Sequence, residues 1–141
     1  MAIRGRSVSE AHEGAIKALD GLRGIWNLFL NRRSSWRISN ELPRPVNRIL
    51  LGPIQTMHLS NGKLAEENFW YDPGYMGPLG RVNLSADERL AILKFEKFLR
   101  AQIRQSKDRA RIEEFIVRYC RSLDDRNLQT SFLNLWTLWR C

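Results

Sequence analysis

The sequence predicts an α+β protein that is mainly α, with an N-terminal helix, a central β-hairpin and two or three C-terminal helices. Two capping-box patterns, Ser7-Val-Ser-Glu10 and Ser85-Ala-Asp-Glu88, indicate helix starts, because the Ser hydroxyl and the Glu carboxylate satisfy amides that the first helical turn leaves exposed. Between them, Asn61-Gly62 is typical of a tight turn between two strands. The expected order is therefore helix, hairpin, helices.

The chain has the size of one ordinary domain. Its 141 residues are 43% apolar and 27% charged, a composition typical of folded proteins. We expect residues 1–83 to contain the N-terminal helix and the hairpin, and residues 84–141 to form a helical region. The two regions are expected to pack as one compact unit.

The first helix is expected to run from about Glu10 to Asn31. Its apolar residues recur at helical spacing, which indicates packing against a core rather than a ligand site. Three glycines within it, Gly14, Gly21 and Gly24, weaken the helix but permit close packing. The expected core stripe comprises Ala15, Leu19, Leu22, Trp26, Phe29 and Leu30.

A basic and aromatic segment follows this helix. It contains Arg32, Arg33, Trp36 and Arg37, and such a mixture can contact phosphate and stack on an unpaired base. The alternative is a solvated helix end, with the arginines near the negative pole of the helix and Trp36 covering the core.

The hairpin is expected to pair residues 47–59 with residues 64–71, since both flanks are rich in branched and aromatic residues. Asn61-Gly62 can supply the positive backbone angles of the turn. His58, just before it, has no partner at metal-ligand spacing and is interpreted as a polar strand residue. No metal and no cofactor are expected.

The second capping box opens a helix that is expected to reach about Gln105, to kink near Ser106 and to continue as a further helix to Leu123. Buried positions are expected at Leu90, Leu93, Ile112, Phe115, Ile116 and Tyr119.

A cationic stripe occupies another face of this region if the helix is continuous. Such a stripe would bind phosphates with strong salt dependence and little sequence preference. The alternative is a solvated face paired with neighbouring acids. The stripe comprises Lys97, Arg100, Arg104, Lys107 and Arg111.

The net charge of +8 lies at the two ends of the chain. Residues 1–50 carry nine basic and four acidic residues, residues 84–141 carry twelve and eight, and the middle is nearly neutral. This distribution favours an anionic partner such as nucleic acid. The N-terminus lacks the apolar core of a signal peptide and no apolar run could span a bilayer, so we expect a cytoplasmic protein without membrane contact.

The C-terminal residues carry a family pattern. Arg121-Ser-Leu-Asp124 and Phe132-Leu-Asn-Leu-Trp-Thr-Leu138 are similar to successive helices of the ApeA-like branch of the HEPN family, and Pro45–Pro53 and Asn61–Pro73 resemble the region that precedes that domain. The resemblance implies an all-α domain that binds nucleotides or RNA, works in RNA-directed bacterial defence or as a toxin-antitoxin component, and often dimerises.

The chain departs from that pattern after Leu138. Trp139 stands where the family commonly has an acidic residue, and the sequence closes at Cys141, before the Arg and His that HEPN nucleases carry at R-x4-6-H spacing. The C-terminal helices therefore resemble the first half of a HEPN domain. The leading hypothesis is an accessory protein that binds RNA or a partner protein without independent catalysis.

Two alternatives remain open at this point. Arg6 and His12 are separated by five residues, so the chain could be a metal-independent endoribonuclease in which Arg6 stabilises phosphate charge and His12 shuttles a proton. The chain could instead be a structural module whose last helix uses Trp136 and Trp139 to dock on a second copy or on another protein.

Overall fold

The computed structural model describes residues 3–32, 45–65, 69–72, 75, 83–125 and 127–140, with the side chains of residues 128 and 138–140 excepted. In these residues the chain is mainly helical with one small antiparallel strand pair, as the sequence predicted. The elements are α1 (Val8–Leu30), β1 (Ile54–Gln55), β2 (Trp70–Tyr71), α2 (Ala86–Gln105), α3 (Arg109–Asp124) and α4 (Leu128–Arg140).

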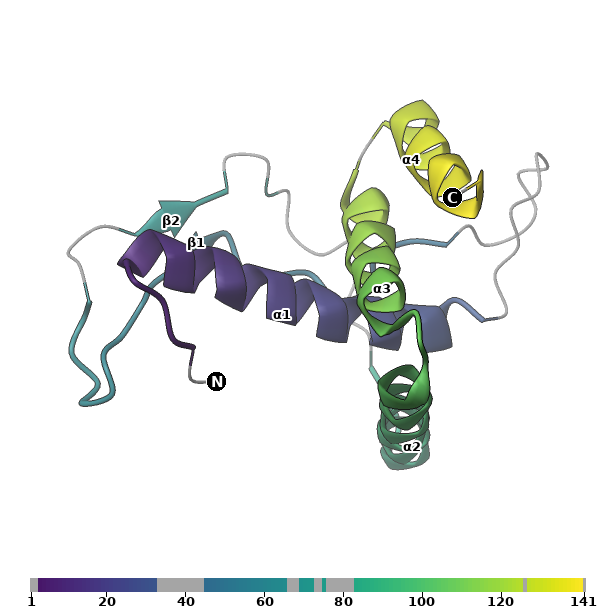
Figure 1. The fold of residues 1–141 in the computed structure, drawn as a ribbon, viewed down its shortest axis with the longest axis horizontal. Coiled ribbons are helices and arrows are strands. Elements are labelled where there is room, and N and C mark those ends of the chain that lie inside the picture. The colour runs from purple at the N-terminus through teal and green to yellow at the C-terminus, as the bar shows by residue number, and fades with distance from the viewer. Residues whose placement is uncertain are drawn as a thin grey trace.

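Helix α3 is the centre of the helical part. It packs against the C-terminal half of α1 and also contacts α2 and α4, which lie toward its opposite ends (Figure 1). The strand pair lies beside the N-terminal half of α1. Among the described residues, no helix combines the length and the apolar character needed to cross a membrane.

Both predicted helix starts are present. The Ser7 hydroxyl accepts from the Glu10 N–H at 3.1 Å, while the Glu10 carboxylate accepts from the N–H of Arg6 rather than from the capping residue itself. At α2 the capping box is complete, because Ser85 and Glu88 each accept from the other's N–H. These backbone and side-chain hydrogen bonds with Ser85 lower the pKa of Glu88.

The strands are much shorter than predicted. The pairing was expected to join residues 47–59 to residues 64–71, but among the described residues it comprises the ladder of Ile54–Gln55 with Trp70–Tyr71 and an isolated bridge between His58 and Leu64. The first strand begins later than expected because the backbone groups of residues 46–49 bond to side chains of α1 and of Asn31, which caps it, instead of to a strand. Two residues per strand give little stability by themselves, so the pair depends on its packing against α1.

The turn uses one positive backbone angle rather than two. Gly62 has φ of +83°, and it is the only described residue outside the ordinary negative range. Asn61 contributes through its side chain, whose Oδ1 accepts from the N–H of Lys63 at 3.0 Å. An isolated bridge between His58 and Leu64 closes the turn.

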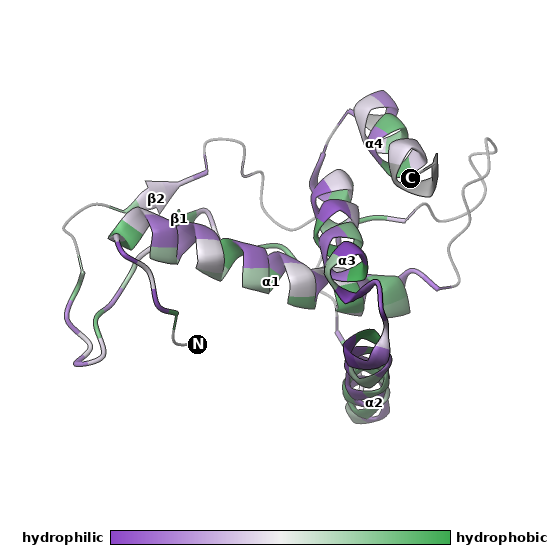
Figure 2. Cartoon of the chain, viewed as in Figure 1, coloured by the Kyte–Doolittle hydropathy of each residue, from purple (hydrophilic) through white to green (hydrophobic). Residues whose placement is uncertain are grey.

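The apolar core lies where α1, α2 and α3 meet. Its buried members are Ile25, Ile103 and Ile116, one from each helix. Partly buried side chains that pack against them are Trp26, Phe95, Leu99 and Ile112. Figure 2 shows hydrophobic and hydrophilic residues interspersed along α1 and α2, so the core occupies only part of each helix surface.

The expected burial of Leu90 and Leu93 is wrong. Their exposed fractions are 57% and 53%, because the opposite face of α2, which carries Ile92 and Ile103, meets the other helices. The helical spacing was correct, but it did not show which of two apolar faces packs inward.

Gly24 allows α1 and α3 to approach closely. A Cβ at this position would lie 2.5 Å from the carbonyl oxygen of Ile116 and 2.6 Å from its Cγ2, distances at which the helices must move apart. At Gly21, three residues earlier on the same helix, the nearest atom to such a Cβ is Val117 Cγ2 at 3.9 Å.

Gly24→Ala is therefore expected to lower the free energy of unfolding by about 1–3 kcal/mol, because overpacking outweighs the gain in helix propensity. Gly21→Ala is the matched control and should be neutral or stabilising by up to about 1 kcal/mol. Urea unfolding of both variants measures the difference. Equal stability of the two variants would contradict the close helix packing.

Candidate nucleic-acid interface

A groove of about 580 Å3 lies between α1, α2 and α3. Apolar side chains make up half of its lining residues, and we call them its floor; Gly14 and Gly21 on α1 also line it. The apolar lining residues are Ala18, Leu19, Leu22, Ile25, Ile103, Ile116 and Val117. The groove can therefore accept the flat apolar face of a ligand.

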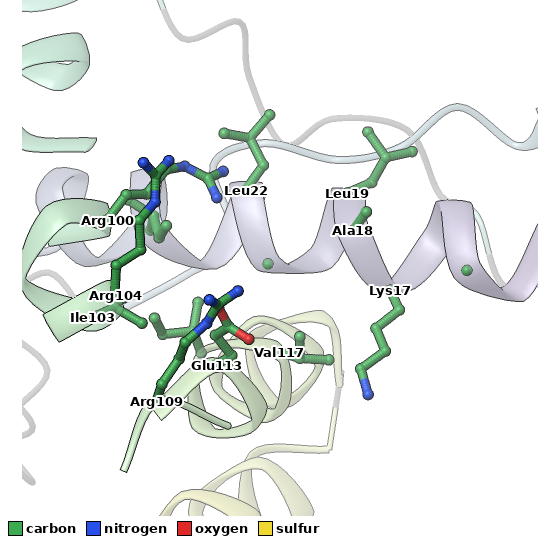
Figure 3. A pocket seen from close by; sticks show the side chains of 14 residues that line it. Lys17, Ala18, Leu19, Leu22, Arg100, Ile103, Arg104, Arg109, Glu113 and Val117 are labelled. Carbon is green, nitrogen blue, oxygen red and sulfur yellow. The ribbon is translucent and has the colours of Figure 1, made fainter. Parts of the chain in front are cut away.

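Cations surround this apolar floor. Lys17 comes from α1, Arg100 and Arg104 from α2, and Arg109 from α3, whereas Glu113 is the single acidic residue among those that line the groove. Figure 3 shows Arg100 and Arg104 extending from α2 toward Leu22 of α1, with Arg109 beside Glu113. We call this set, together with its floor, the cationic groove.

The cations differ in how far they are already neutralised. Arg100 donates from Nε to Glu96 at 2.8 Å, and Arg109 donates from Nε to Glu113 at 2.9 Å. Lys17 makes a longer ion pair of 3.5 Å with Glu114, and its side chain is 64% exposed. Arg104 has no hydrogen bond or ion pair within the described part of the chain. Its guanidinium is the group most available to an incoming anion.

Arg100 is held in place by a chain of contacts. The Trp26 Nε1–H donates to one carboxylate oxygen of Glu96 at 2.7 Å, and Arg100 Nε donates to the other. The Glu96 side chain is only 19% exposed, so its position is fixed by packing as well as by hydrogen bonds. Among the described residues, this contact uses only the Nε of the Arg100 guanidinium.

The predicted stripe is not continuous. Helix α2 ends at Gln105 and α3 begins at Arg109, with Ser106 in an extended conformation between them. The break places Lys97, Arg100 and Arg104 on α2, Lys107 in the connection and Arg111 on α3. Arg111 lies over the Phe115 ring at 5.4 Å, and neither it nor Lys107 lines the groove.

Sequence reasoning missed Lys17 and Arg109, which complete the cationic groove. Arg109 follows the helix break, so helical spacing from Arg104 could not place it. Lys17 lies on another helix, between two glycines that also face the groove. The Gly14, Lys17, Gly21 spacing was the only local signal of this open face.

The basic segment after α1 is described only at its first residue. Arg32 donates from Nη1 to the carbonyl oxygen of Phe29 at 2.7 Å, and its guanidinium lies 3.8 Å from the centre of the Phe29 ring. These contacts fit the solvated helix end. Arg33, Trp36 and Arg37 lie outside the described residues.

His12 joins α1 to the strand pair. Its ring stacks on Trp70 with centroids 3.9 Å apart and an interplanar angle of 6°, and its Nε2 lies 2.9 Å from Oε1 of Gln55. The Arg6 backbone N–H binds Glu10, and Arg6 is exposed. In the part of the chain that is described, no hydrogen bond or ion pair joins Arg6 to His12.

Helix α4 presents aromatic surface. Phe132 and Trp136 are 47% and 49% exposed, and their rings stack with centroids 6.0 Å apart. The side chain of Trp139 is among those that the structure does not describe. On the other face of α4, the Ser131 hydroxyl donates to the carbonyl oxygen of Ser122 at 2.6 Å, and both residues are buried.

A second polar site lies inside the fold and was not foreseen. The most buried positions of α1 and its C-terminal cap include Asp20, Arg23, Asn27 and the cap Asn31, rather than the expected apolar stripe. Their spacing of three, four and four residues puts them on one face of the helix. That polar spacing was visible in the sequence and was the available signal.

Arg23 is the hub of this buried polar cluster. Its Nη1 donates to Asp20 at 2.8 Å, its Nη2 donates to both carboxylate oxygens of Asp124 at 2.8 and 3.0 Å, and its Nε donates to the carbonyl oxygen of Ile49 at 2.7 Å. Arg121 donates to the other oxygen of Asp20. The cluster therefore ties α1, α3 and the segment before β1 together.

Asparagines extend the cluster. Asn27 is fully buried, donates to Asn47 Oδ1 at 2.7 Å and accepts from the N–H of Arg48 at 2.9 Å. Asn47 in turn donates to Asp124. Burial raises the pKa of Asp124, although the attraction of Arg23 opposes that rise.

Three potential metal ligands meet in the same cluster. Asp20, Cys120 and Asp124 bring one donor atom each within 4.8 Å of one another. The Arg23 guanidinium already binds both carboxylates, and burial raises the pKa of the Cys120 thiol to about 12, so the sulfur is protonated. The donor set in this state does not suit a cation, because a bound metal requires a thiolate.

In a Cys141→Ser variant, Cys120 is expected to react with iodoacetamide only when the protein opens. A pKa of about 12 leaves roughly one thiol in ten thousand ionised at pH 8, and the side chain is fully buried. Mass spectrometry of native and denatured samples over time measures the two rates. Labelling of the native protein at the denatured rate would contradict this burial.

Comparisons with protein-family models, with curated proteins and with solved structures find no match for this chain.

Proposed function

We propose that this chain is a HEPN-like protein that binds single-stranded nucleic acid, RNA in the first place, in the cationic groove, without cleaving it by itself. The observation that carries the proposal is the joint placement of Arg100, Arg104 and Arg109 beside an apolar floor, with Lys17 on the facing helix. Sequence resemblance to HEPN domains supports the choice of RNA.

The chemistry of the groove favours an unpaired strand. Arginine guanidinium groups bind phosphate through paired N–H donors, and apolar surface supports the face of a base. In a duplex the base faces are stacked on one another and cannot reach such a floor. A small dicarboxylate would use the cations but would leave the apolar floor unused.

The binding test is a fluorescence anisotropy titration of labelled single-stranded RNA and of its duplex across a salt series. Neutralising three or four phosphates predicts a slope of about −2 to −3 in log K against log salt for the single strand. Denaturing gels of the same samples report whether the RNA stays intact. Affinity that does not change with salt, or stronger binding of the duplex, would contradict the proposal.

A second candidate function is self-association through α4, with a second copy of the chain as the occupant. The observation that favours it is the exposed face of α4, where Leu133 is 57% exposed beside the half-exposed Phe132 and Trp136. HEPN-like proteins often act as dimers, and the sequence resemblance makes a dimer a hypothesis for this chain as well.

Leu133→Glu is expected to shift the protein from dimer to monomer in sedimentation velocity, because a charge in an apolar contact is costly. Asn134→Glu adds the same charge at the next position, which is exposed on another face of α4, and should leave the dimer intact. A wild-type protein that is monomeric at all concentrations would exclude this candidate.

A further inference from the structure

A second hollow, of about 470 Å3, shares two arginines with the cationic groove. It is lined by Leu93, Glu96, Lys97, Arg100, Ala101 and Arg104. Arg100 and Arg104 line both hollows, so their side chains form a shared wall. Each hollow falls in the size range of pockets that hold small ligands.

The second hollow repeats the chemistry of the first. Leu93 supplies apolar surface and is 53% exposed, although its place in the helical spacing suggested burial. Lys97 is exposed and has no ion pair among the residues described. An apolar surface beside a free cation again suits a base or sugar next to a phosphate.

The shared wall has donors available to both sides. Arg104 uses none of its N–H groups within the described residues, and Arg100 uses only Nε, at Glu96. A guanidinium presents five donors in a planar fork, so it can hold a phosphate from its free edge. In a nucleic-acid strand, the phosphate that could occupy this position links two successive nucleosides.

We propose that the smallest ligand that fully uses the site is a dinucleotide step: its linking phosphate binds Arg100 and Arg104, one nucleoside lies in the cationic groove, and the next lies against Leu93 and Lys97. This inference rests on the proposed function and narrows it. The ligand is a strand that crosses the edge of α2, and a mononucleotide fills only one of the two hollows.

The test compares adenosine monophosphate with the dinucleotide ApA by NMR titration of the intact chain. ApA carries less charge than adenosine monophosphate, so tighter binding cannot come from charge alone. We expect ApA to bind about tenfold more tightly, which corresponds to one additional base contact.

Lys97→Ala should weaken ApA about threefold to tenfold and leave adenosine monophosphate unchanged, because Lys97 lines only the second hollow. Lys94→Ala is the matched control, since Lys94 is exposed on the same helix and lines neither hollow. Both variants remove one surface charge, so a general electrostatic effect would appear in both.

Two results overturn the inference in different ways. Equal affinity for the two ligands and no effect of Lys97→Ala, with a twelve-nucleotide RNA still bound, would remove the dinucleotide site and leave the proposed function standing. Failure of the twelve-nucleotide RNA to bind at all would remove both.

Discussion

Replacement of Arg23 by Met is expected to lower the free energy of unfolding by about 3–5 kcal/mol. The Arg23 side chain is 7% exposed and bonds two carboxylates and one backbone carbonyl. Met has similar length but no donor, so Asp124 loses its cation and the carbonyl of Ile49 loses its partner. Removing one member of a buried ionic cluster leaves the other charges buried without a partner, which is strongly destabilising. Replacing the whole cluster by well-packed apolar residues is often neutral or stabilising.

Arg118→Met is the control, because Arg118 lies on α3, which packs against α1, and also binds a carboxylate, that of Glu114 at 3.0 Å. That ion pair is exposed on both sides, so the expected loss is below about 0.5 kcal/mol. Urea unfolding of the two variants against the wild type measures both values. A loss at Arg23 no larger than that at Arg118 would show that the buried cluster does not hold the helices together.

The stability deficit of Arg23→Met should also depend on pH. Attraction to Arg23 opposes the rise in the pKa of Asp124 that burial causes, so its removal raises that pKa further. A carboxyl with a raised folded pKa costs stability above that pKa, and the cost disappears as pH falls through it. The deficit is therefore expected to shrink between neutral pH and about pH 4.

Arg104→Glu is expected to weaken binding of single-stranded RNA by about tenfold to a hundredfold at low salt. The change removes a side chain that donates hydrogen bonds to phosphate and adds a negative charge that repels phosphate beside Arg100. Glu113 is the one acidic residue among those that line the groove. Arg104 makes no contact with other described residues through hydrogen bonds or ion pairs, so the substitution should leave the fold intact.

Arg89→Glu is the matched control for this binding experiment. Arg89 is exposed on the same helix and lines neither hollow, so the same change in net charge occurs outside the site. Anisotropy titrations at several salt concentrations, with circular dichroism to confirm folding, compare the two. Equal loss in both variants would mean that RNA responds to net charge rather than to the cationic groove.

The sequence predicted those parts of the fold that local signals control. The capping box at Ser85–Glu88 predicted the start of α2, and the kink expected near Ser106 is a break between α2 and α3 at which Ser106 is extended. The strands at Ile54–Gln55 and Trp70–Tyr71 were predicted too long, because the backbone of the preceding segment bonds to side chains of α1.

The candidate site was predicted only in part, since it depends on contacts between distant residues. Arg100 and Arg104 were recognised from their spacing, but Arg109 reaches the same groove only because the chain turns after Gln105. In the buried cluster, Arg23 and Asp124 are 101 residues apart, and no local pattern joins them. Helical spacing shows which residues share one face of a helix, but which element packs against that face is decided by the tertiary fold.

Crosslinking of 4-thiouridine-substituted RNA, followed by mapping of the modified peptides, tests the central claim most directly. A strand in the cationic groove predicts crosslinks to residues 14–25 of α1 and to residues 93–117 of α2 and α3, reduced in Arg104→Glu and retained in Arg89→Glu. Crosslinks confined to α4 or to the strand pair, and unchanged in Arg104→Glu, would contradict the assignment of this groove as the nucleic-acid site.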